Sequence, residues 1–409
     1  MNGFSEEITL EGHIIDSLIL PKVWGAVMDL GGEFEIQELR IGRRKDEPSF
    51  MRLKISADSD KRLHLILNEL QDFGAELVSR EDVHTEPVPA DGVLPDDFYS
   101  TTHLPTQVRL NGKWVDVQAT EMDLVIVVDR ANARARMIPM ADVRQGEQIA
   151  VGHGGIRVIP MQRSRSREIF SFMGSDVSSE KPKRLVIEEI ARQMKETRAR
   201  KGKILVVAGP AIVHSGAGQY LARIIHAGYV QALFGGNAIA AHDVESALLG
   251  TSLGTALHSG EAVEGGHRHH MVAINAIRRA GGLRQAVEQG ILREGIMYEC
   301  ICQNVELVLA GSVRDDGPLP DVITDMGEAQ RRMRAAVQGA EMALMIATML
   351  HSIATGNMLP ASTKIVAVDI NPAVVTKLAD RGTFQALGLV TDAELFMREL
   401  AEALGVNGV

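Results

Sequence analysis

The first 80 residues alternate between strand-like and helix-like spacing of apolar side chains. In "MRLKIS", Met51, Leu53 and Ile55 alternate with polar residues, which predicts a strand with one buried face. Apolar residues between Leu63 and Phe73 recur at helical intervals. With the neighbouring segments the order is βαββαβ, which is typical of a ferredoxin-like plait. We therefore expect residues 1–80 to form an α+β domain, for which a packing role is the simpler interpretation and ligand binding the alternative.

Residues 81–165 predict a second, β-rich domain. The segment 81–105 contains four prolines and is expected to form a loop. Asn111-Gly112 then stands between two alternating runs, which is a strong signal for a β-hairpin. The runs "LVIVVD" and "IRVIPM" continue the strand pattern, so we expect a small antiparallel barrel or sheet. A polar connector follows to about residue 180.

From residue 180 to residue 409, helical stretches alternate with short apolar strands. The expected strands are "ILVVAG", "QALFGG", "VELVLAG", "KIVAVD" and "LGLVT". This alternation is typical of an α/β domain with a mainly parallel, Rossmann-like sheet. Ligands of such sheets lie beyond the carboxyl ends of the strands, so the candidate site residues are those that follow each strand.

Composition and charge exclude several classes of protein. The 409-residue chain has a formal net charge of -10, which disfavours general binding to nucleic acid or to an anionic membrane. We read the apolar stretch "GAEMALMIATMLHSIATGNML" as a helix that Glu341 and His351 interrupt and that is too short to span a bilayer. The acidic start "MNGFSEEITLEG" is not a secretory signal. We expect no nucleic-acid or membrane partner and a cytoplasmic location.

The chain has two cysteines, Cys300 and Cys302, and we read the segment around them as a buried strand that also contains Glu299. A packing role is favoured over nucleophilic catalysis, and two cysteines alone cannot form a structural zinc site. Reduced cysteines fit the expected cytoplasmic location.

The glycine-rich turn after "ILVVAG" matches a dinucleotide-binding fingerprint only in part. Gly216-Ala217-Gly218 precedes a helix, but Leu221 stands where the fingerprint has its third glycine. The acid expected about twenty residues later is also missing, because Asn237 and Ala238 occupy that place. Asp369, at the end of "KIVAVD", could bind a ribose diol instead. Spacing alone leaves open both a dinucleotide site and a sheet that binds no ligand.

Several long motifs in a fixed order indicate a family. They are "PADGVLPDDFYSTTHLPTQVRLNGKWV", "GGNAIAAHDVE", "EGGHRHH", "AGSVRDDGPLPDV" and "VDINPAVVTKLADRG". With these motifs, nearly the whole chain resembles the archaeal and cyanobacterial type of ornithine cyclodeaminase, a family that carries the LOR/SDH region. The α/β part is similar to the NAD-binding domain of deoxyhypusine synthase. Some relatives have an upstream arginine-degrading domain; this chain starts at the plait, so we expect no action on arginine.

The resemblance implies NAD as the cofactor and L-ornithine as the substrate, which would be converted to L-proline and ammonia. A hydride would pass transiently from the α-carbon to NAD and return after the δ-amine has displaced ammonia. The resemblance also implies a homo-oligomer, either a tetramer or a dimer. The implied cofactor contacts are Asn237, Ala238, Asp316, Thr348, Met349, Leu350, His351, Asp369, Asp392 and Ala393.

The catalytic groups follow less directly from the sequence. A protonated alkyl amine cannot attack, and removing its proton at pH 7 costs roughly 4.6 kcal/mol, so a base is needed. Asp315 could hold or deprotonate the substrate ammonium, or one acid of "RDD" could simply cap a turn. In "EGGHRHH", Arg268 could bind the substrate carboxylate and His269 or His270 could move protons. The alternative interpretation of "EGGHRHH" is a loop that is solvated or lies at an interface, and a metal site is disfavoured.

Two other functions remain possible on the sequence. One is a true amino-acid dehydrogenase of the saccharopine or lysine type, which would release NADH. The other is a non-enzymatic sensor that binds NAD and an amino acid. Homologous folds host different chemistry, so the substrate does not follow from the fold.

Overall fold

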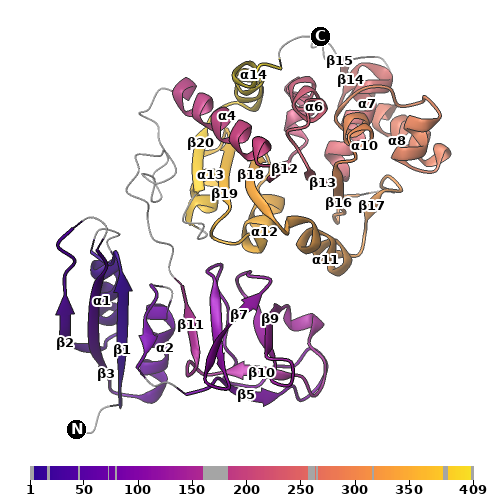
Figure 1. The fold of residues 1–409 in the computed structure, drawn as a ribbon. Coiled ribbons are helices and arrows are strands. Elements are labelled where there is room, and N and C mark those ends of the chain that lie inside the picture. Colours follow the sequence, from indigo (N-terminus) through magenta and orange to yellow (C-terminus); the bar gives the residue numbers. More distant parts are fainter. Residues whose placement is uncertain are drawn as a thin grey trace. The chain divides into compact units, whose positions relative to one another are not determined.

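The computed structural model describes residues 4–15, 19–44, 47–71, 73–78, 81–159, 183–256, 263, 266–315, 317–380 and 386–406. Its contacts divide the chain into two compact units, Met1–Ser166 with Pro360–Ser362, and Arg167–Leu359 with Thr363–Val409 (Figure 1). Most of the predicted polar connector lies outside the described residues. The predicted α+β region followed by an α/β region is confirmed, while the division of the first unit at residue 80 stays a prediction.

The first unit begins with a four-stranded antiparallel sheet in the order β2-β3-β1-β4. Its elements are β1 (Phe4–Gly12), α1 (Ile19–Asp29), β2 (Glu33–Arg40), β3 (Ser49–Ala57), α2 (Asp60–Gln71) and β4 (Glu76–Leu77). The apolar faces of both helices and of β1 and β3 form one hydrophobic core. Gly32 allows the chain to turn closely after α1, because a Cβ there would lie 2.4 Å from Ile66 Cδ1. The predicted βαββαβ order is therefore present.

The second sheet of this unit has seven strands in the order β11-β6-β7-β9-β8-β10-β5. They are β5 (His84–Pro87), β6 (Thr106–Leu110), β7 (Lys113–Gln118), β8 (Val125–Asp129), β9 (Arg134–Ile138), β10 (Gln148–Val151) and β11 (Ile156–Val158), with a short 3-10 helix at Met140–Asp142. The pairs are antiparallel except β7 with β9. The predicted hairpin is confirmed: Asn111 and Gly112 have φ of 51° and 76°, which suits a two-residue hairpin turn.

The prediction that residues 81–105 form a loop is wrong for His84–Pro87, which form strand β5. Among the described strands, β5 pairs with β10 alone, and it ends at Pro87, a position at which an edge strand tolerates proline. The proline-rich sequence hid the strand because its ladder depends on a partner about 60 residues away.

The second unit is built on an all-parallel sheet in the order β17-β16-β13-β12-β18-β19-β20. Its strands are β12 (Lys203–Ala208), β13 (Ala232–Gly236), β16 (Glu306–Ala310), β17 (Val322–Ile323), β18 (Ala340–Ile346), β19 (Lys364–Asp369) and β20 (Ala386–Val390). Leaving the short β17 aside, this is the 3-2-1-4-5-6 order of the doubly wound dinucleotide-binding fold. The predicted Rossmann-like sheet is therefore confirmed.

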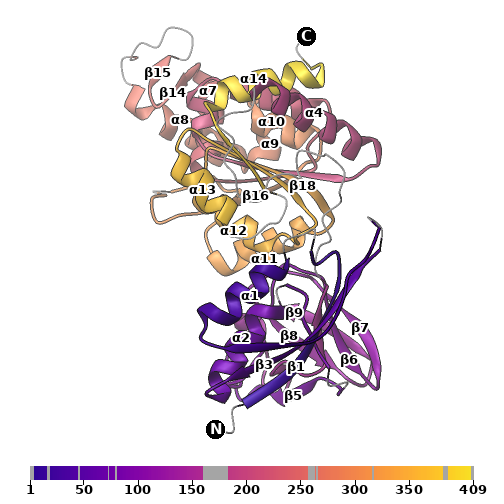
Figure 2. The ribbon, with the colours of Figure 1, turned by 90° about the vertical axis from the view of Figure 1, so that its left-hand side faces the viewer.

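Helices cover both faces of this sheet (Figure 2). On one face lie α4 (Lys183–Ala199), α5 (Ala211–His214), α6 (Gly218–His226), α7 (Asn237–Leu249), α8 (His269–Ala280), α9 (Leu283–Glu288), α10 (Ile296–Cys302) and α14 (Ala393–Leu404). On the other lie α11 (Met326–Val337), α12 (Leu350–Met358) and α13 (Pro372–Asp380). A small hairpin, β14 (Thr251–Ser252) with β15 (Thr255–Ala256), and the 3-10 helix Gly266–Arg268 connect α7 to α8. Alternate residues of the buried strands enter the two cores.

The sequence suggested that the apolar stretch after Gly339 is one helix, and this prediction is wrong. Its first seven residues form β18, which pairs with β12 and β19, and only the part from Leu350 is helical. A strand that is buried on both faces has no polar alternation, so its pattern does not distinguish it from a buried helix. The alanines and methionines of this run favour the helical reading.

The predicted strand around Cys300 and Cys302 is also wrong, because this segment forms helix α10. Gly295, with φ 104°, turns the chain into the helix, and Asp243 of α7 accepts hydrogen bonds from the N–H groups of Ile296 and Met297. The cap comes from more than 50 residues away, so the local sequence does not reveal it. Cys300 is buried and Cys302 exposed, and both are free thiols.

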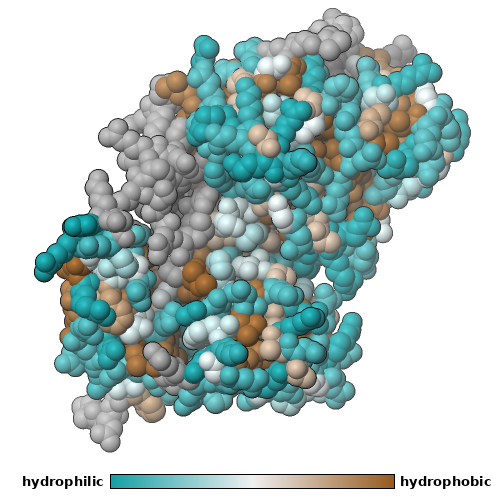
Figure 3. All heavy atoms as spheres, in the orientation of Figure 1, coloured by the Kyte–Doolittle hydropathy of each residue, from teal (hydrophilic) through white to brown (hydrophobic). Residues whose placement is uncertain are grey.

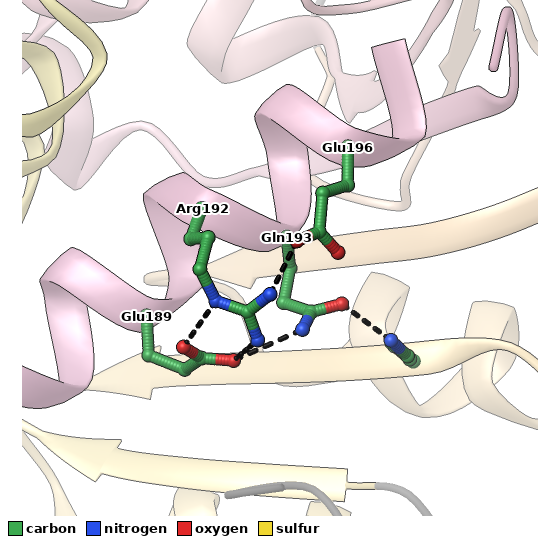
Figure 4. A network of polar contacts seen from close by, with 5 residues as sticks. Glu189, Arg192, Gln193 and Glu196 are labelled. Carbon is green, nitrogen blue, oxygen red and sulfur yellow. Dashed lines mark hydrogen bonds and ion pairs between the residues drawn. The ribbon is translucent and has the colours of Figure 1, made fainter. Parts of the chain in front are cut away.

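A polar network fixes α4 to the sheet (Figure 4). The buried Gln193 donates to Glu189 Oε1 at 2.9 Å and accepts from Lys364 Nζ at the start of β19. Arg192 Nε donates to Glu189 Oε2 at 2.7 Å, and Arg192 also pairs with Glu196. Partial burial raises the pKa of Glu189, but the hydrogen bonds from Arg192 and Gln193 outweigh this and leave it below its usual value.

We expect Gln193→Leu to lower the free energy of unfolding by about 1–3 kcal/mol, because the buried Gln193 loses its two hydrogen bonds, to the half-buried Glu189 and Lys364. Urea unfolding measures the change. Arg184→Ala on the same helix is the control: Arg184 forms an exposed pair with Glu188, so its loss should cost less than about 0.5 kcal/mol. Equal costs for the two variants would contradict the role of Gln193.

Hydrophilic residues cover most of the coloured surface in Figure 3, and hydrophobic ones form small separate patches. Among the described residues, no helix is long and apolar enough to cross a membrane.

Candidate functional site

The strand order reverses direction between β12 and β18, and this switch point is where sheets of this type bind ligands. The segments that leave the two strands touch there. Gly209 N–H donates to Ile346 O at 3.0 Å, and a Cβ on Gly209 would lie only 1.8 Å from Ala347 O. Ala347 itself has φ 53°, an unusual left-handed conformation for a residue with a side chain. The backbone is therefore held in a special conformation at the predicted ligand crevice.

The helix that starts nearest to the switch point on the β18 side is α12. It begins at Leu350, directly after the predicted cofactor residues Thr348 and Met349, and has no side-chain cap at its N-terminus. Ser352, in its first turn, is fully buried, and its Oγ has no partner among the described residues. The free N–H groups at this helix start could bind an anion.

The glycine fingerprint is incomplete because the first βα connection is longer than usual. The short helix α5 lies between β12 and α6, so the glycine-rich turn opens a helix well beyond the strand end. Leu221, in place of the third glycine, is buried in the core. A helix start close to a strand end is found instead after β18, where α12 begins four residues beyond the strand.

The ends of β13 and β16 bring several predicted residues towards α12. A Cβ on Gly236 would lie 3.1 Å from His351 Cε1, so the strand end passes close to this ring. Asn237 Oδ1 accepts from Leu319 N–H at 3.0 Å. Burial lowers the pKa of His351, and the charge of Asp315 acts in the opposite direction. Asn237, Asp315 and His351 therefore gather at one place.

Asp315 also holds its own loop. Its carboxylate accepts from Ser312 N–H at 2.8 Å and from Ser312 Oγ at 3.3 Å. Asp315 therefore stabilises a turn, as the alternative interpretation of this pair of acids expected for one of them. Asp316 lies outside the described residues.

The other half of the sheet carries Asp369 and Asp392. Asp369 is the last residue of β19; its Oδ1 accepts from Asn371 N–H at 2.8 Å, and Oδ2 has no partner among the described residues. Asp392 caps α14 by accepting from Glu394 N–H and Leu395 N–H, and Ala393 after it is buried. Thr391 N–H donates to Asp369 O at 3.1 Å, so the two strand ends are adjacent. Asp369 keeps one carboxylate oxygen for a ligand.

Large apolar side chains are exposed at the same edge of the sheet. They are Val313 after β16, Met349 and Leu350 after β18, and Ile370 after β19. Leu350 is 73% and Ile370 72% exposed. The flat rings of a dinucleotide would cover apolar surface of this kind, so these residues fit NAD.

A second group of residues, which we name the histidine cluster, joins three sequence motifs. It consists of His214, His242, His269, His270 and the carboxylate of Glu245. The side chain of Glu245 is 0% exposed and that of His242 is 12% exposed. Glu245 Oε2 lies 2.9 Å from His242 Nδ1, and Oε1 accepts from Thr251 Oγ1 at 2.9 Å and from Gly254 N–H at 3.1 Å.

The remaining histidines surround this carboxylate. The His214 ring is centred 4.7 Å from that of His242, and His214 Nδ1 lies 2.6 Å from Ser252 Oγ. His269 Nδ1 lies 2.8 Å from Thr251 Oγ1, and the His270 ring is centred 6.4 Å from that of His242. In the described part of the chain, no three His, Cys, Asp or Glu side chains are arranged to hold a metal ion.

The structure thus brings the predicted His269 and His270 together with residues that the sequence did not single out. His214 lies two residues before the glycine-rich turn and His242 stands inside "GGNAIAAHDVE", but no local spacing links them to "EGGHRHH". Arg268, predicted to bind substrate, is exposed just before α8. Gly266, two residues before it, has a packing reason, because a Cβ on Gly266 would lie 2.4 Å from Gly254 O.

A cavity of about 880 Å³ lies between α6, α7 and α10. Asp243, Arg223 and Glu294 line it, together with Gly216 and Gly218 of the glycine-rich turn. Burial raises the pKa of Asp243 to about 6. None of the predicted cofactor residues that the structure describes lines this cavity, so the strand ends remain the better candidate for a nucleotide.

Comparisons with known proteins identify the family. Residues 5–104 match the LOR/SDH bifunctional enzyme conserved region, 105–187 the first region of the arginine dihydrolase ArgZ-like C-terminus, and 188–400 its Rossmann fold. An ornithine cyclodeaminase from Methanocaldococcus jannaschii is 54% identical over 407 residues, or 98% of this chain and 96% of that protein. The chain belongs to the ornithine cyclodeaminase family. The predicted family is therefore confirmed.

Solved structures of this family extend the comparison. A conserved LOR/SDH protein from Methanococcus maripaludis S2 aligns with 80% of this chain and 97% of its own, at 49% identity and a TM-score of 0.75. The ternary complex of AgrE with ornithine and NAD+ aligns with 98% of this chain at 44% identity and a TM-score of 0.54. The chain spans 58% of the length of AgrE.

Proposed function

We propose that the protein is an NAD-dependent ornithine cyclodeaminase that converts L-ornithine to L-proline and ammonia. The observation that carries this proposal is the relationship over nearly the full length of archaeal ornithine cyclodeaminases. It is supported by the family's complex with ornithine and NAD+. It is also supported by the sheet of this chain, whose strand order and switch point are those of a dinucleotide-binding fold.

The residues at the strand ends would hold NAD. The free oxygen of Asp369 would accept from a ribose hydroxyl, and the start of α12 from Thr348 to His351 would face the pyrophosphate. The exposed Leu350 and Ile370 would pack against its rings. The further contacts that we propose are Asn237, Ala238, Asp316, Met349, Asp392 and Ala393. When bound, NAD accepts a hydride from the substrate and returns it.

The protein's own side chains must hold the ammonium groups and the carboxylate of the substrate. Asp315 lies in the loop that follows β16, close enough to His351 for their charges to interact, so its carboxylate could anchor an ammonium group there. Arg268 is exposed and could bind the substrate carboxylate. These two assignments and the proton-handling role of His269 and His270 are parts of the proposal.

Three broader features belong to the same proposal. Residues 1–80 would form a ferredoxin-like plait, which is supported by the order βαββαβ and by the antiparallel strand order β4-β1-β3-β2. The enzyme would be a homo-oligomer, either a tetramer or a dimer. It would act in the cytoplasm, where its two cysteines would stay reduced.

We expect L-ornithine deuterated at the α-carbon to give L-proline that keeps nearly all of its α-deuterium, because the hydride leaves and returns without reaching water. Mass spectrometry of the proline measures the label. In the control, unlabelled ornithine in heavy water should give proline without α-deuterium. Loss of the label to solvent would contradict internal hydride return, and steady release of NADH would favour the amino-acid dehydrogenase.

A further inference from the structure

The histidine cluster has a fixed order of hydrogen bonds that starts at Glu245. An ionised carboxylate only accepts, so His242 must donate its Nδ1 proton to Glu245 Oε2, 2.9 Å away. Thr251 gives its hydroxyl proton to Glu245 Oε1, so its oxygen accepts from His269 Nδ1 at 2.8 Å. In their neutral forms, His242 and His269 therefore both carry an unprotonated Nε2.

The charges in the cluster support this assignment. Burial raises the pKa of Glu245, but hydrogen bonds from His242, Gly254 and Thr251 outweigh it and leave the pKa below its usual value. Burial lowers the pKa of His214, a positive charge on His242 lowers it further, and Glu245 opposes both. Near neutral pH, the cluster thus combines an ionised carboxylate with a neutral histidine. The other titratable groups of the cluster are His269 and His270 of α8.

The cluster also borders the strand ends. Ala238, His242 and Glu245 are spaced by four and three residues, so they share one face of α7. Ala238 is exposed in the first turn of α7, directly after β13, and His242 follows one turn later, about 6 Å along the helix axis. His214 ends α5, which leaves the end of β12. The face thus leads from the predicted cofactor contact to the buried carboxylate.

The proposed reaction needs a group that stores protons. Ornithine carries two ammonium groups and one carboxylate, and the products are zwitterionic proline and an ammonium ion. The two sides have equal charge and equal numbers of protons, so every proton that is removed must be returned. A histidine is suited to this because its pKa lies near neutral pH.

We propose that the histidine cluster is the proton-handling part of this active site, with His242 as the base and Glu245 as its positioning residue. This inference rests on the proposed function. An N–H bond of the substrate's δ-ammonium breaks, and the proton moves to His242 Nε2. The α-ammonium loses one proton to water, and the α-carbon gives up its hydride and becomes the carbon of a C=N bond. The released electron pair of the δ-nitrogen forms the new bond to this carbon, while the π electrons of the C=N bond move onto the original nitrogen. That nitrogen takes a proton from the ring nitrogen and leaves as ammonia, as the ring nitrogen's electron pair forms a new C=N bond. The ammonia takes the proton back from His242, the hydride returns to the α-carbon, and the ring nitrogen takes a proton from water.

The experiment compares His242→Gln and Glu245→Gln with His226→Gln. His226 lies 3.0 Å from Glu299, so the control also loses a histidine that is paired with a glutamate, but outside the cluster. We expect kcat to fall by about 100- to 10,000-fold in His242→Gln and also to fall in Glu245→Gln. The loss of kcat/KM at low pH, where the base is protonated, should disappear from the His242→Gln profile. Calorimetry should give NAD affinities within about threefold of the unmodified protein.

Imidazole distinguishes a proton carrier from a structural residue. Added imidazole should restore part of the turnover of His242→Ala, and the rescue should follow the concentration of its neutral form. Unchanged kcat and pH profile in His242→Gln would overturn the proposal. Parallel losses of turnover, NAD affinity and thermal stability without rescue by imidazole would also overturn it. The unmodified protein is assayed first, so that absence of proline formation there contradicts the proposed function itself.

Discussion

Asp369→Ala should lower the affinity for NAD by about ten- to ten-thousand-fold while the protein remains folded. Asp369 ends β19 with Oδ2 free of partners among the described residues, so one or two ribose hydroxyl groups could donate to its carboxylate. Hydrogen bonds to charged groups are each worth roughly 1.5–3 kcal/mol, and about 1.4 kcal/mol corresponds to a tenfold change in affinity. Isothermal titration with NAD measures the loss.

Asp325→Ala is the matched control for this variant. Asp325 caps α11 in the same unit by accepting from Glu328 N–H at 2.7 Å, and it is not among the proposed cofactor contacts. Its loss should lower thermal stability slightly and leave the affinity for NAD unchanged. If Asp369→Ala binds NAD as the control does, the ribose assignment is wrong.

Local patterns were sufficient for most of the fold. The hairpin at Asn111-Gly112 follows from two residues that accept positive φ, and five of the parallel strands follow from short apolar runs. The sequence misled us at β5, β18 and α10, where the decisive contact is distant. β5 needs β10, β18 is buried between β12 and β19, and α10 is capped by Asp243.

The candidate site divides in the same way. Asn237, Asp315 and Asp369 could be placed beforehand, because the carboxyl ends of parallel strands always share one edge of the sheet. The partners of His269 and His270 could not, since His214, His242 and Glu245 come from separate segments that only the fold assembles. Ser352 was missed because a lone serine inside an apolar helix carries no local signal.

Gly209→Ala should be among the most disruptive single-methyl additions in the second unit. The new Cβ would lie 1.8 Å from the carbonyl oxygen of Ala347 and 3.1 Å from Thr348 Cβ. The nearest neighbour is backbone, so no side-chain rotation can relieve the overlap, and the segments after β12 and β18 must separate. Overpacking costs about 1–3 kcal/mol and occasionally more, and here we expect about 3 kcal/mol. Because Thr348 begins the proposed cofactor segment, NAD affinity should also fall at least about tenfold.

Gly218→Ala adds the same methyl group in the same connection and separates the local overlap from a general effect of replacing glycine. A Cβ on Gly218 would meet Ile296 Cδ1 at 3.7 Å, which is ordinary contact, and Gly218 starts α6, where alanine is favoured over glycine. This variant should be as stable as the unmodified protein or slightly more so, with unchanged NAD affinity. Urea unfolding and titration with NAD compare the two variants. If they behave alike, the close contact at the switch point does not constrain the nucleotide site.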